Sequence, residues 1–176
     1  MSQVIFLHGP SSSGKSTVSR ALQAKIEKPF WHISIDHLRD SGVLPSARFK
    51  SGEFDWKAAK SSFFNGFHAS LAAYANSGNN LILEHILDKD QWLADLRQLL
   101  IGHDVYFVGV HCSLDVLIAR EASRGNRPLG SAQDDFKTVH VGKAYDLEIR
   151  SEDGLDHNVD LILKGWRTGL RASSFA

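Results

Sequence analysis

The residues best suited to chemistry lie near the start of the chain, where residues 9–16 have the sequence G-P-S-S-S-G-K-S. This segment, which we call the phosphate loop, matches G-x-x-x-x-G-K-[ST] at every fixed position. Its two glycines let the backbone curl so that successive N–H groups face an anion, and the helix expected after it adds partial positive charge. The alternative is a Ser/Gly-rich turn that contains a lysine by chance. We expect these residues to bind ATP: Gly9, Pro10, Ser11, Ser12, Ser13, Gly14, Lys15, Ser16 and Thr17.

Two side chains of the phosphate loop have individual expected roles. Lys15 should reach the β- and γ-phosphates and act in catalysis, and the Ser16 hydroxyl should ligate Mg²⁺. Glu84 follows the apolar run Leu81-Ile82-Leu83, where a carboxylate can hold Mg²⁺ through a water molecule. The nine histidines include no pair at H-x-x-x-H or H-x-H spacing, so the spacing does not predict a histidine metal site.

Asp36 is the candidate catalytic base. It follows the run His32-Ile33-Ser34-Ile35, which places it at the edge of a sheet where open α/β folds bind ligands. A carboxylate there can accept the proton of an acceptor hydroxyl and orient that hydroxyl for in-line attack. The alternative is that Asp36 only caps the helix that begins at His37.

Three arginines, Arg120, Arg124 and Arg127, are spaced four and three residues apart. Guanidinium groups stabilise the charge that spreads over the γ-phosphate during transfer. We expect Arg120 to bind ATP, and Arg124 and Arg127 to act in catalysis. The alternative is a solvated basic helix end, which the helix dipole favours.

Aromatic residues are the candidates for an apolar acceptor pocket, although most aromatic stripes belong to the core. The candidates are Trp31, Trp56, Phe63, Phe64 and Phe67, of which we take Trp56, Phe63 and Phe67 as acceptor-binding residues.

Alternating strands and helices must position these residues. Apolar runs predict strands over residues 4–7, 30–35, 81–83, 105–110 and 145–149, and helical periodicity predicts helices over 15–27, 56–76, 91–101, 114–124 and 155–169. Such alternation is typical of βαβ units. It predicts an α/β, three-layer P-loop fold, with a mostly parallel five-stranded sheet and helices on both faces. Residues 42–55 are expected to form a loop or short helices, and residues 126–137 a mobile loop within a lid at about 125–138.

Composition excludes several classes of protein. The chain has 176 residues, which suits one domain over 1–176, with 43% hydrophobic and 23% charged residues. Lys and Arg total 20, as do Asp and Glu, so no net positive field favours a nucleic-acid partner. The single cysteine excludes an internal disulfide. No apolar run approaches the ~18 residues of a membrane span, and we expect a cytoplasmic protein without a membrane partner. The oligomeric state is not predicted.

Taken together, the motifs resemble those of the chloramphenicol phosphotransferase family. Besides the phosphate loop, the similar segments are I-S-I-D-H-L at 33–38, L-I-L-E-H at 81–85, V-G-V-H-C at 108–112, R-E-A-S-R-G-N-R at 120–127 and V-H-V-G-K-A-Y-D at 139–146. The resemblance implies an ATP- and Mg²⁺-dependent O-phosphotransferase with a shikimate-kinase-like fold. The family's proposed base falls on Asp36, and its phosphate-contacting lid arginines fall on Arg124 and Arg127. The chain differs from a family member at Glu84, where that member carries Asp, and it matches poorly over residues 42–60.

Three functions are compatible with these patterns. The first is phosphorylation of a hydroxyl on a small molecule, including inactivation of an antibiotic. The second is a metabolic kinase of the shikimate, gluconate or nucleoside type. The third is a nucleotide-binding regulator without an acceptor, whose slow ATP hydrolysis no small hydroxyl compound would stimulate.

Overall fold

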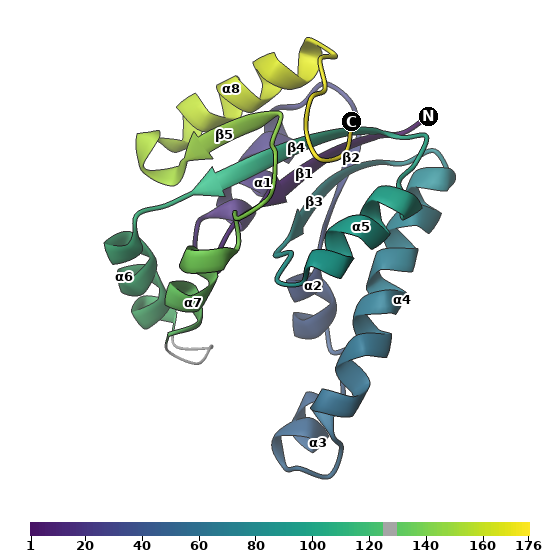
Figure 1. Ribbon diagram of the computed structural model, residues 1–176, viewed down its shortest axis with the longest axis vertical. Helices are drawn as coiled ribbons and strands as arrows, with labels where there is room; N and C mark the ends of the chain where they lie inside the picture. Colours follow the sequence, from purple (N-terminus) through teal and green to yellow (C-terminus); the bar gives the residue numbers. More distant parts are fainter. Residues whose placement is uncertain (125–129) are drawn as a thin grey trace.

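A five-stranded parallel sheet organises the chain in the computed structural model, which describes residues 1–124 and 130–176 (Figure 1). All four pairings between neighbouring strands are parallel, in the order β2-β3-β1-β4-β5. The strands are β1 (Gln3–His8), β2 (Phe30–Ser34), β3 (Asn80–His85), β4 (Asp104–His111) and β5 (Leu147–Arg150). The parallel α/β fold predicted from the sequence is therefore confirmed.

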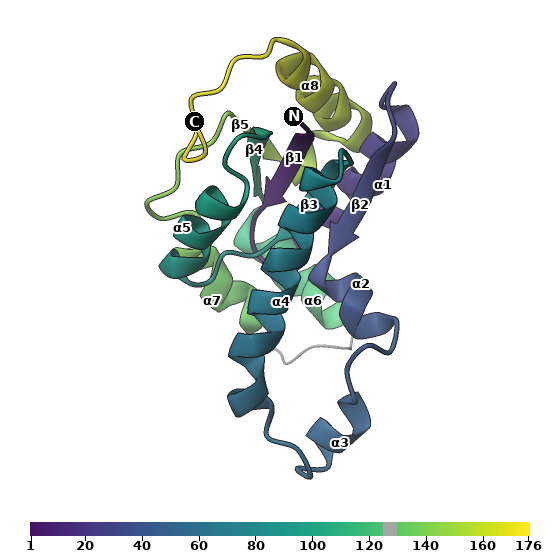
Figure 2. The ribbon, with the colours of Figure 1, turned by 90° about the vertical axis from the view of Figure 1, so that its right-hand side faces the viewer.

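Helices cover both faces of the sheet and make three layers. Figures 1 and 2 show α1 and α8 on one face and α4 and α5 on the other. The helices are α1 (Lys15–Lys25), α2 (Ile35–Asp40), α3 (Ser46–Lys50), α4 (Trp56–Asn76), α5 (Asp90–Leu99), α6 (Leu114–Arg124), α7 (Ser131–Thr138) and α8 (Leu155–Arg167), with a short 3₁₀ helix, η1 (Ser151–Asp153). Among the described helices, none combines the length and apolar character needed to cross a membrane.

The central strand β1 explains why its sequence is apolar without alternation. Ile5 and Leu7 pack into the core cluster under α1 and α8. Val4 and Phe6 pack into the second cluster, under α4 and α5. A parallel strand with helices on both faces has no side open to water, so the four inner residues of β1, Val4 to Leu7, are all apolar.

The helices that follow β1, β2 and β4 all begin at the carboxyl ends of these strands. α1, α2 and α6 therefore start at one edge of the sheet, and α3 and the first turns of α4 project beyond it (Figure 1). Asp55 caps α4, because its carboxylate accepts a hydrogen bond from the Lys57 amide at 2.8 Å. This edge is where open α/β sheets bind ligands.

Two expected segments differ in the structure. The strand predicted over 30–35 ends at Ser34, and Ile35 already begins α2. The loop predicted over 126–137 was wrong for its second half, because residues 131–138 form α7. This polar stretch contains neither Gly nor Pro, and α7 packs beside α6 (Figure 1). Polar composition therefore indicated exposure but not the absence of a helix.

Two helical glycines predict opposite effects of the same substitution. A Cβ at Gly66 in α4 would meet no heavy atom within 4 Å, so Gly66→Ala should stabilise the fold by about 0.5–1 kcal/mol. A Cβ at Gly165 in α8 would lie 2.0 Å from the hydroxyl of buried Tyr106, so Gly165→Ala should cost roughly 1–3 kcal/mol. Urea unfolding of both variants measures the difference. Equal stabilities would show that α8 is not packed against Tyr106 as described.

Candidate active site

The phosphate loop joins β1 to α1, and each of its two glycines has a separate physical reason. A Cβ on Gly9 would lie 2.3 Å from the backbone oxygen of Val110 in β4, so only glycine allows this approach. Gly14 caps α1 with φ at +95°, in the left-handed region that glycine tolerates best. These glycines curl the loop around the start of α1, where backbone N–H groups favour an anion.

Lys15 and Ser16 point to different sides of this loop. Lys15 is 8% exposed, and its Nζ donates hydrogen bonds to the backbone oxygens of Gly9 (2.9 Å) and Pro10 (2.7 Å). Ser16 Oγ instead donates to Glu84 Oε2 at 2.8 Å. The loop therefore holds a cation over its backbone, while its hydroxyl contacts a carboxylate from β3.

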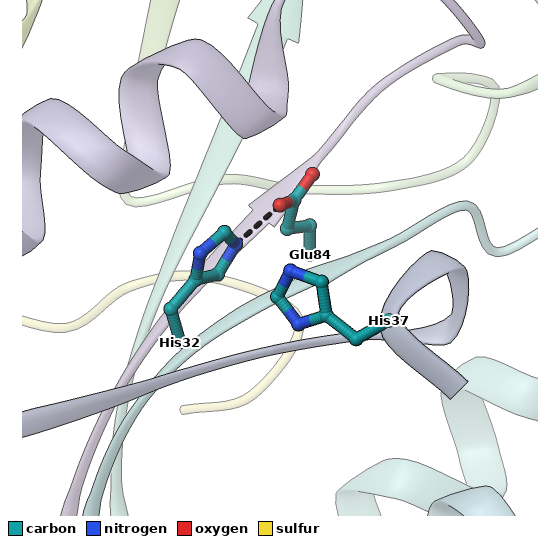
Figure 3. A group of neighbouring side chains, drawn as sticks. All are labelled: His32, His37 and Glu84. Atoms are coloured by element: carbon teal, nitrogen blue, oxygen red, sulfur yellow. Dashed lines mark hydrogen bonds and ion pairs between the residues drawn. The ribbon is translucent and has the colours of Figure 1, made fainter. Parts of the chain in front are cut away.

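Glu84 is buried, and hydrogen bonds keep it ionised. Burial by itself raises the pKa of Glu84, but the hydrogen bonds to His32 and Ser16 and the charges of His32 and Lys15 lower the pKa below its ordinary value. Figure 3 shows His32 contacting the other carboxylate oxygen, Oε1. An ionised carboxylate beside a serine hydroxyl offers the oxygen ligands that Mg²⁺ prefers, so this pair fits the expected metal site.

Asp36 lies in the first turn of α2, and it is not the cap of this helix. The alternative role considered for it is therefore wrong, because Ser34 Oγ caps α2 by accepting a hydrogen bond from the His37 amide at 3.3 Å. The Asp36 side chain is 30% exposed and forms an ion pair with Arg39, with 3.1 Å between Oδ1 and Nη1. Arg39 therefore holds the Asp36 carboxylate at the N-terminal end of α2, where it stays partly exposed.

Arg120 reaches the phosphate loop from α6. Its Nη1 donates to the backbone oxygen of Ser12 at 3.4 Å and to Ser151 Oγ at 3.1 Å. Arg124 is the last residue of α6, but its side chain lies outside the described part of the structure. Arg127 lies wholly outside the described residues. The structure thus brings one of the three expected arginines to the loop.

Asp135 of α7 also contacts the phosphate loop, and the sequence did not predict this contact. Its Oδ2 accepts a hydrogen bond from the Ser11 amide at 2.9 Å. This N–H belongs to the loop that the pattern assigns to phosphate oxygens. The carboxylate of α7 therefore occupies one donor of the expected anion site. Nothing in the local sequence distinguishes Asp135 from its exposed neighbour Asp134.

A cavity of about 1300 Å³ unites these groups at the edge of the sheet. Lys15, Ser16, Asp36 and Glu84 line one part of it, together with Arg120. The other part has an aromatic wall, made of Trp56, Phe63, Phe64 and Trp92. The phosphate-binding pattern, the candidate base and two of the three candidate acceptor residues therefore share a single space.

Phe67, the third candidate for acceptor binding, lies in the core instead. It is 2% exposed and packs in the cluster under α4 and α5. Phe67 lies one turn of α4 beyond Phe63 and Phe64, towards the sheet, where the helix is covered on its inner face. Trp31 is 57% exposed and lines a second, smaller cavity, which Phe63 and Phe67 also line. Aromatic character alone did not separate pocket from core.

Trp92 of the aromatic wall was not among the residues expected there, and neither was His85, which packs behind the wall. The Trp92 ring stacks on Phe64, with centroids 4.3 Å apart, and on His85, at 5.2 Å. His85 Nε2 lies 2.9 Å from His68 Nε2 in the interior. Burial lowers the pKa of His85 well below its ordinary value, and the charges of His68 and Lys15 add to the effect. The imidazole that packs against the Phe64 and Trp92 rings is therefore neutral.

Solved structures of small kinases share this fold. A gluconokinase from Sinorhizobium meliloti 1021 has a TM-score of 0.67 at 21% identity, covering 95% of this chain and 92% of its own. A sugar kinase from Janibacter sp. HTCC2649 has a TM-score of 0.70 at 15% identity, covering 98% and 100%. Shikimate kinase from Aquifex aeolicus has a TM-score of 0.62 at 18% identity, covering 94% and 96%. At these identities the likeness concerns the fold.

Sequence relatives identify the family. A candidate O-phosphotransferase, present in two strains of Mycobacterium tuberculosis, is 26% identical over 166 residues, which cover 84% of this chain and 74% of the relative. The model of the family described as chloramphenicol phosphotransferase-like protein matches residues 2–172, nearly the whole chain. The chain therefore belongs to the chloramphenicol phosphotransferase-like family, whose P-loop fold is that of the small-molecule kinases.

Proposed function

We propose that this protein transfers the γ-phosphate of ATP to a hydroxyl group of a small molecule, with Mg²⁺ as cofactor. One observation carries the proposal: the phosphate loop, Glu84 and Asp36 line the same cavity, which continues into an aromatic wall. A phosphate donor and a hydroxyl acceptor can meet there with a carboxylate beside the hydroxyl. Inactivation of an antibiotic is one form of this activity.

The phosphate loop and β3 form the nucleotide side of the proposed site. Backbone N–H groups of the loop bind phosphate oxygens, and Lys15 turns from its own backbone contacts to the β- and γ-phosphates. Ser16 and the ionised Glu84 would hold Mg²⁺, with Glu84 acting through a water molecule. When bound, Mg²⁺ neutralises the charge on the phosphate oxygens. Arg120 binds ATP from α6, beside the loop.

Asp36 acts as the base on the acceptor side. Its carboxylate accepts the proton of the acceptor hydroxyl while that oxygen attacks the γ-phosphorus. Arg39 positions the carboxylate through their ion pair. Arg124 and Arg127 stabilise the charge on the transferred group.

The aromatic wall favours an acceptor with an apolar body. Trp56, Phe63 and Phe64 offer ring faces, and His85 behind them is neutral. A sugar acid, by contrast, needs a hydrogen-bond partner for each of its hydroxyls and a cation for its one carboxylate. Chloramphenicol is therefore a better first acceptor to test than gluconate or shikimate.

An acceptor panel in a coupled ADP assay tests the proposal. Chloramphenicol, gluconate, shikimate and a nucleoside are compared at equal concentration, with Lys15→Ala as the inactive control. We expect ADP release that an apolar hydroxyl compound stimulates and that Lys15→Ala abolishes. Slow release that no acceptor stimulates would support a regulator instead. Stimulation by gluconate or shikimate alone would keep the kinase but overturn the apolar acceptor.

Asp36→Asn tests the base. The substitution keeps the shape of the side chain but removes the proton-accepting charge, so acceptor-dependent turnover should fall by roughly 10²–10⁴. Affinity for an ATP analogue, measured by isothermal titration, should not change. Asp40→Asn is the matched control, because Asp40 lies on the same helix and bonds the same Arg39 but is largely exposed. Full turnover in Asp36→Asn would remove Asp36 from the mechanism.

Asp135→Asn tests the contact between α7 and the phosphate loop. Asp135 competes with phosphate for the Ser11 amide and repels its charge. The variant should therefore bind an ATP analogue about three- to tenfold more tightly, since a partly exposed charged contact is worth roughly 1 kcal/mol. Asp134→Asn removes the same charge one residue away and should have little effect. Weaker binding by Asp135→Asn alone would mean that the carboxylate supports the nucleotide site.

A further inference from the structure

Two histidines and a glutamate from three separate elements converge beside the phosphate loop. His32 comes from β2, His37 from α2 and Glu84 from β3. One ligand atom from each of these residues lies within 4.8 Å of the other two (Figure 3). The chain spacing of these residues follows no metal-binding pattern, and the tertiary fold brings them together.

The two oxygens of Glu84 face two different groups. Oε2 accepts the hydrogen bond from Ser16, on the side of the phosphate loop. Oε1 contacts His32 Nε2, on the side of the histidines. A ligand bound between the histidines and Oε1 is therefore chemically separate from the oxygen ligands proposed for Mg²⁺, although both share one carboxylate.

His37 makes this cluster more than an ion pair. The His32–Glu84 contact accounts for two of its members, but the His37 ring also lies edge-on to His32, with centroids 4.6 Å apart at 77°. The His37 ring forms no hydrogen bond with any residue that the structure describes. Its nitrogens therefore remain available to a further ligand.

We propose that His32, His37 and Glu84 form a binding site for a divalent transition metal of the Zn²⁺ class. Two imidazoles and one carboxylate are an established zinc ligand set, which leaves a fourth position for water. Imidazole nitrogen selects such ions over Mg²⁺, which prefers oxygen ligands. This site goes beyond the proposed transfer reaction and does not require it.

Binding requires only a small rearrangement. Zinc bonds of about 2.0–2.2 Å require His37 to move towards the other two ligand atoms, and His32 and Glu84 to separate enough to admit the ion. His37 is exposed on a six-residue helix, so its ring can move towards the other two. The ion replaces the hydrogen bond between His32 and Glu84, and metal ligation requires both imidazoles in their neutral form. Because Glu84 is common to both groups, a bound ion would draw its charge away from Mg²⁺, a consequence that rests on the proposed function.

Titration of the tag-free, nucleotide-free protein with Co²⁺ tests the site. Co²⁺ takes the place of Zn²⁺, and its visible absorption reports the coordination geometry. We expect one Co²⁺ per chain, bound with a tetrahedral spectrum and displaced by Zn²⁺. His37→Gln should weaken Co²⁺ binding by about tenfold or more, on the scale known for disrupted metal sites. His157→Gln removes an exposed histidine outside the cluster and should leave binding unchanged.

Exposure of His37 makes its variant a fair test, because the fold does not depend on that side chain; circular dichroism checks this. Equal Co²⁺ affinity in His37→Gln and the unmodified chain would overturn the proposed site, as would an equal loss in His157→Gln. These results concern binding alone. Failure of the metal site would therefore leave the transfer reaction intact, and an inactive kinase would leave the metal site intact.

Discussion

A buried negative charge at Glu84 is the constraint on which the site depends. A carboxylate in the interior is costly unless it is paired and hydrogen-bonded. Ser16 and His32 supply these bonds from α1 and β2, on either side of β3. The sheet order β2-β3-β1 places β3 between β2, which carries His32, and β1, which leads into the phosphate loop and α1. The order of the strands and the start of α1 at the phosphate loop are therefore what make the buried charge of Glu84 tolerable.

A second buried network supports the phosphate loop from the other side. The Tyr145 hydroxyl lies 2.8 Å from His8 Nδ1 and 2.7 Å from His140 Nδ1. Burial lowers the pKa of both histidines, that of His140 to about 4, so both stay neutral near pH 7. A hydroxyl has one proton to donate, so Tyr145 donates to one ring and accepts from the other. These contacts tie the segment V-H-V-G-K-A-Y-D to His8, the residue before Gly9. The segment therefore supports the phosphate loop in space although it lies far from the loop in sequence.

The two parts of the cavity have different supports. The phosphate side rests on β1 and β3, whose side chains are buried in both core clusters. The acceptor side is built from α2 and from the turns of α4 that project beyond the sheet. Few core contacts hold these turns, so residues there can change without disturbing the phosphate loop. The segment 42–60 lies in this projecting part.

Local sequence determined the strands, the long helices and the phosphate loop. Continuous apolar runs indicated the buried strands, helical periodicity indicated α4, and the loop pattern placed Lys15 and Ser16. These features depend on neighbours within a few residues, which the sequence displays directly. Only the tertiary structure decided that His32 meets Glu84, that Asp135 contacts Ser11 and that Phe67 is core. Those contacts depend on strand order and on the rotation of each helix over the sheet, which packing between distant segments fixes and no local pattern records.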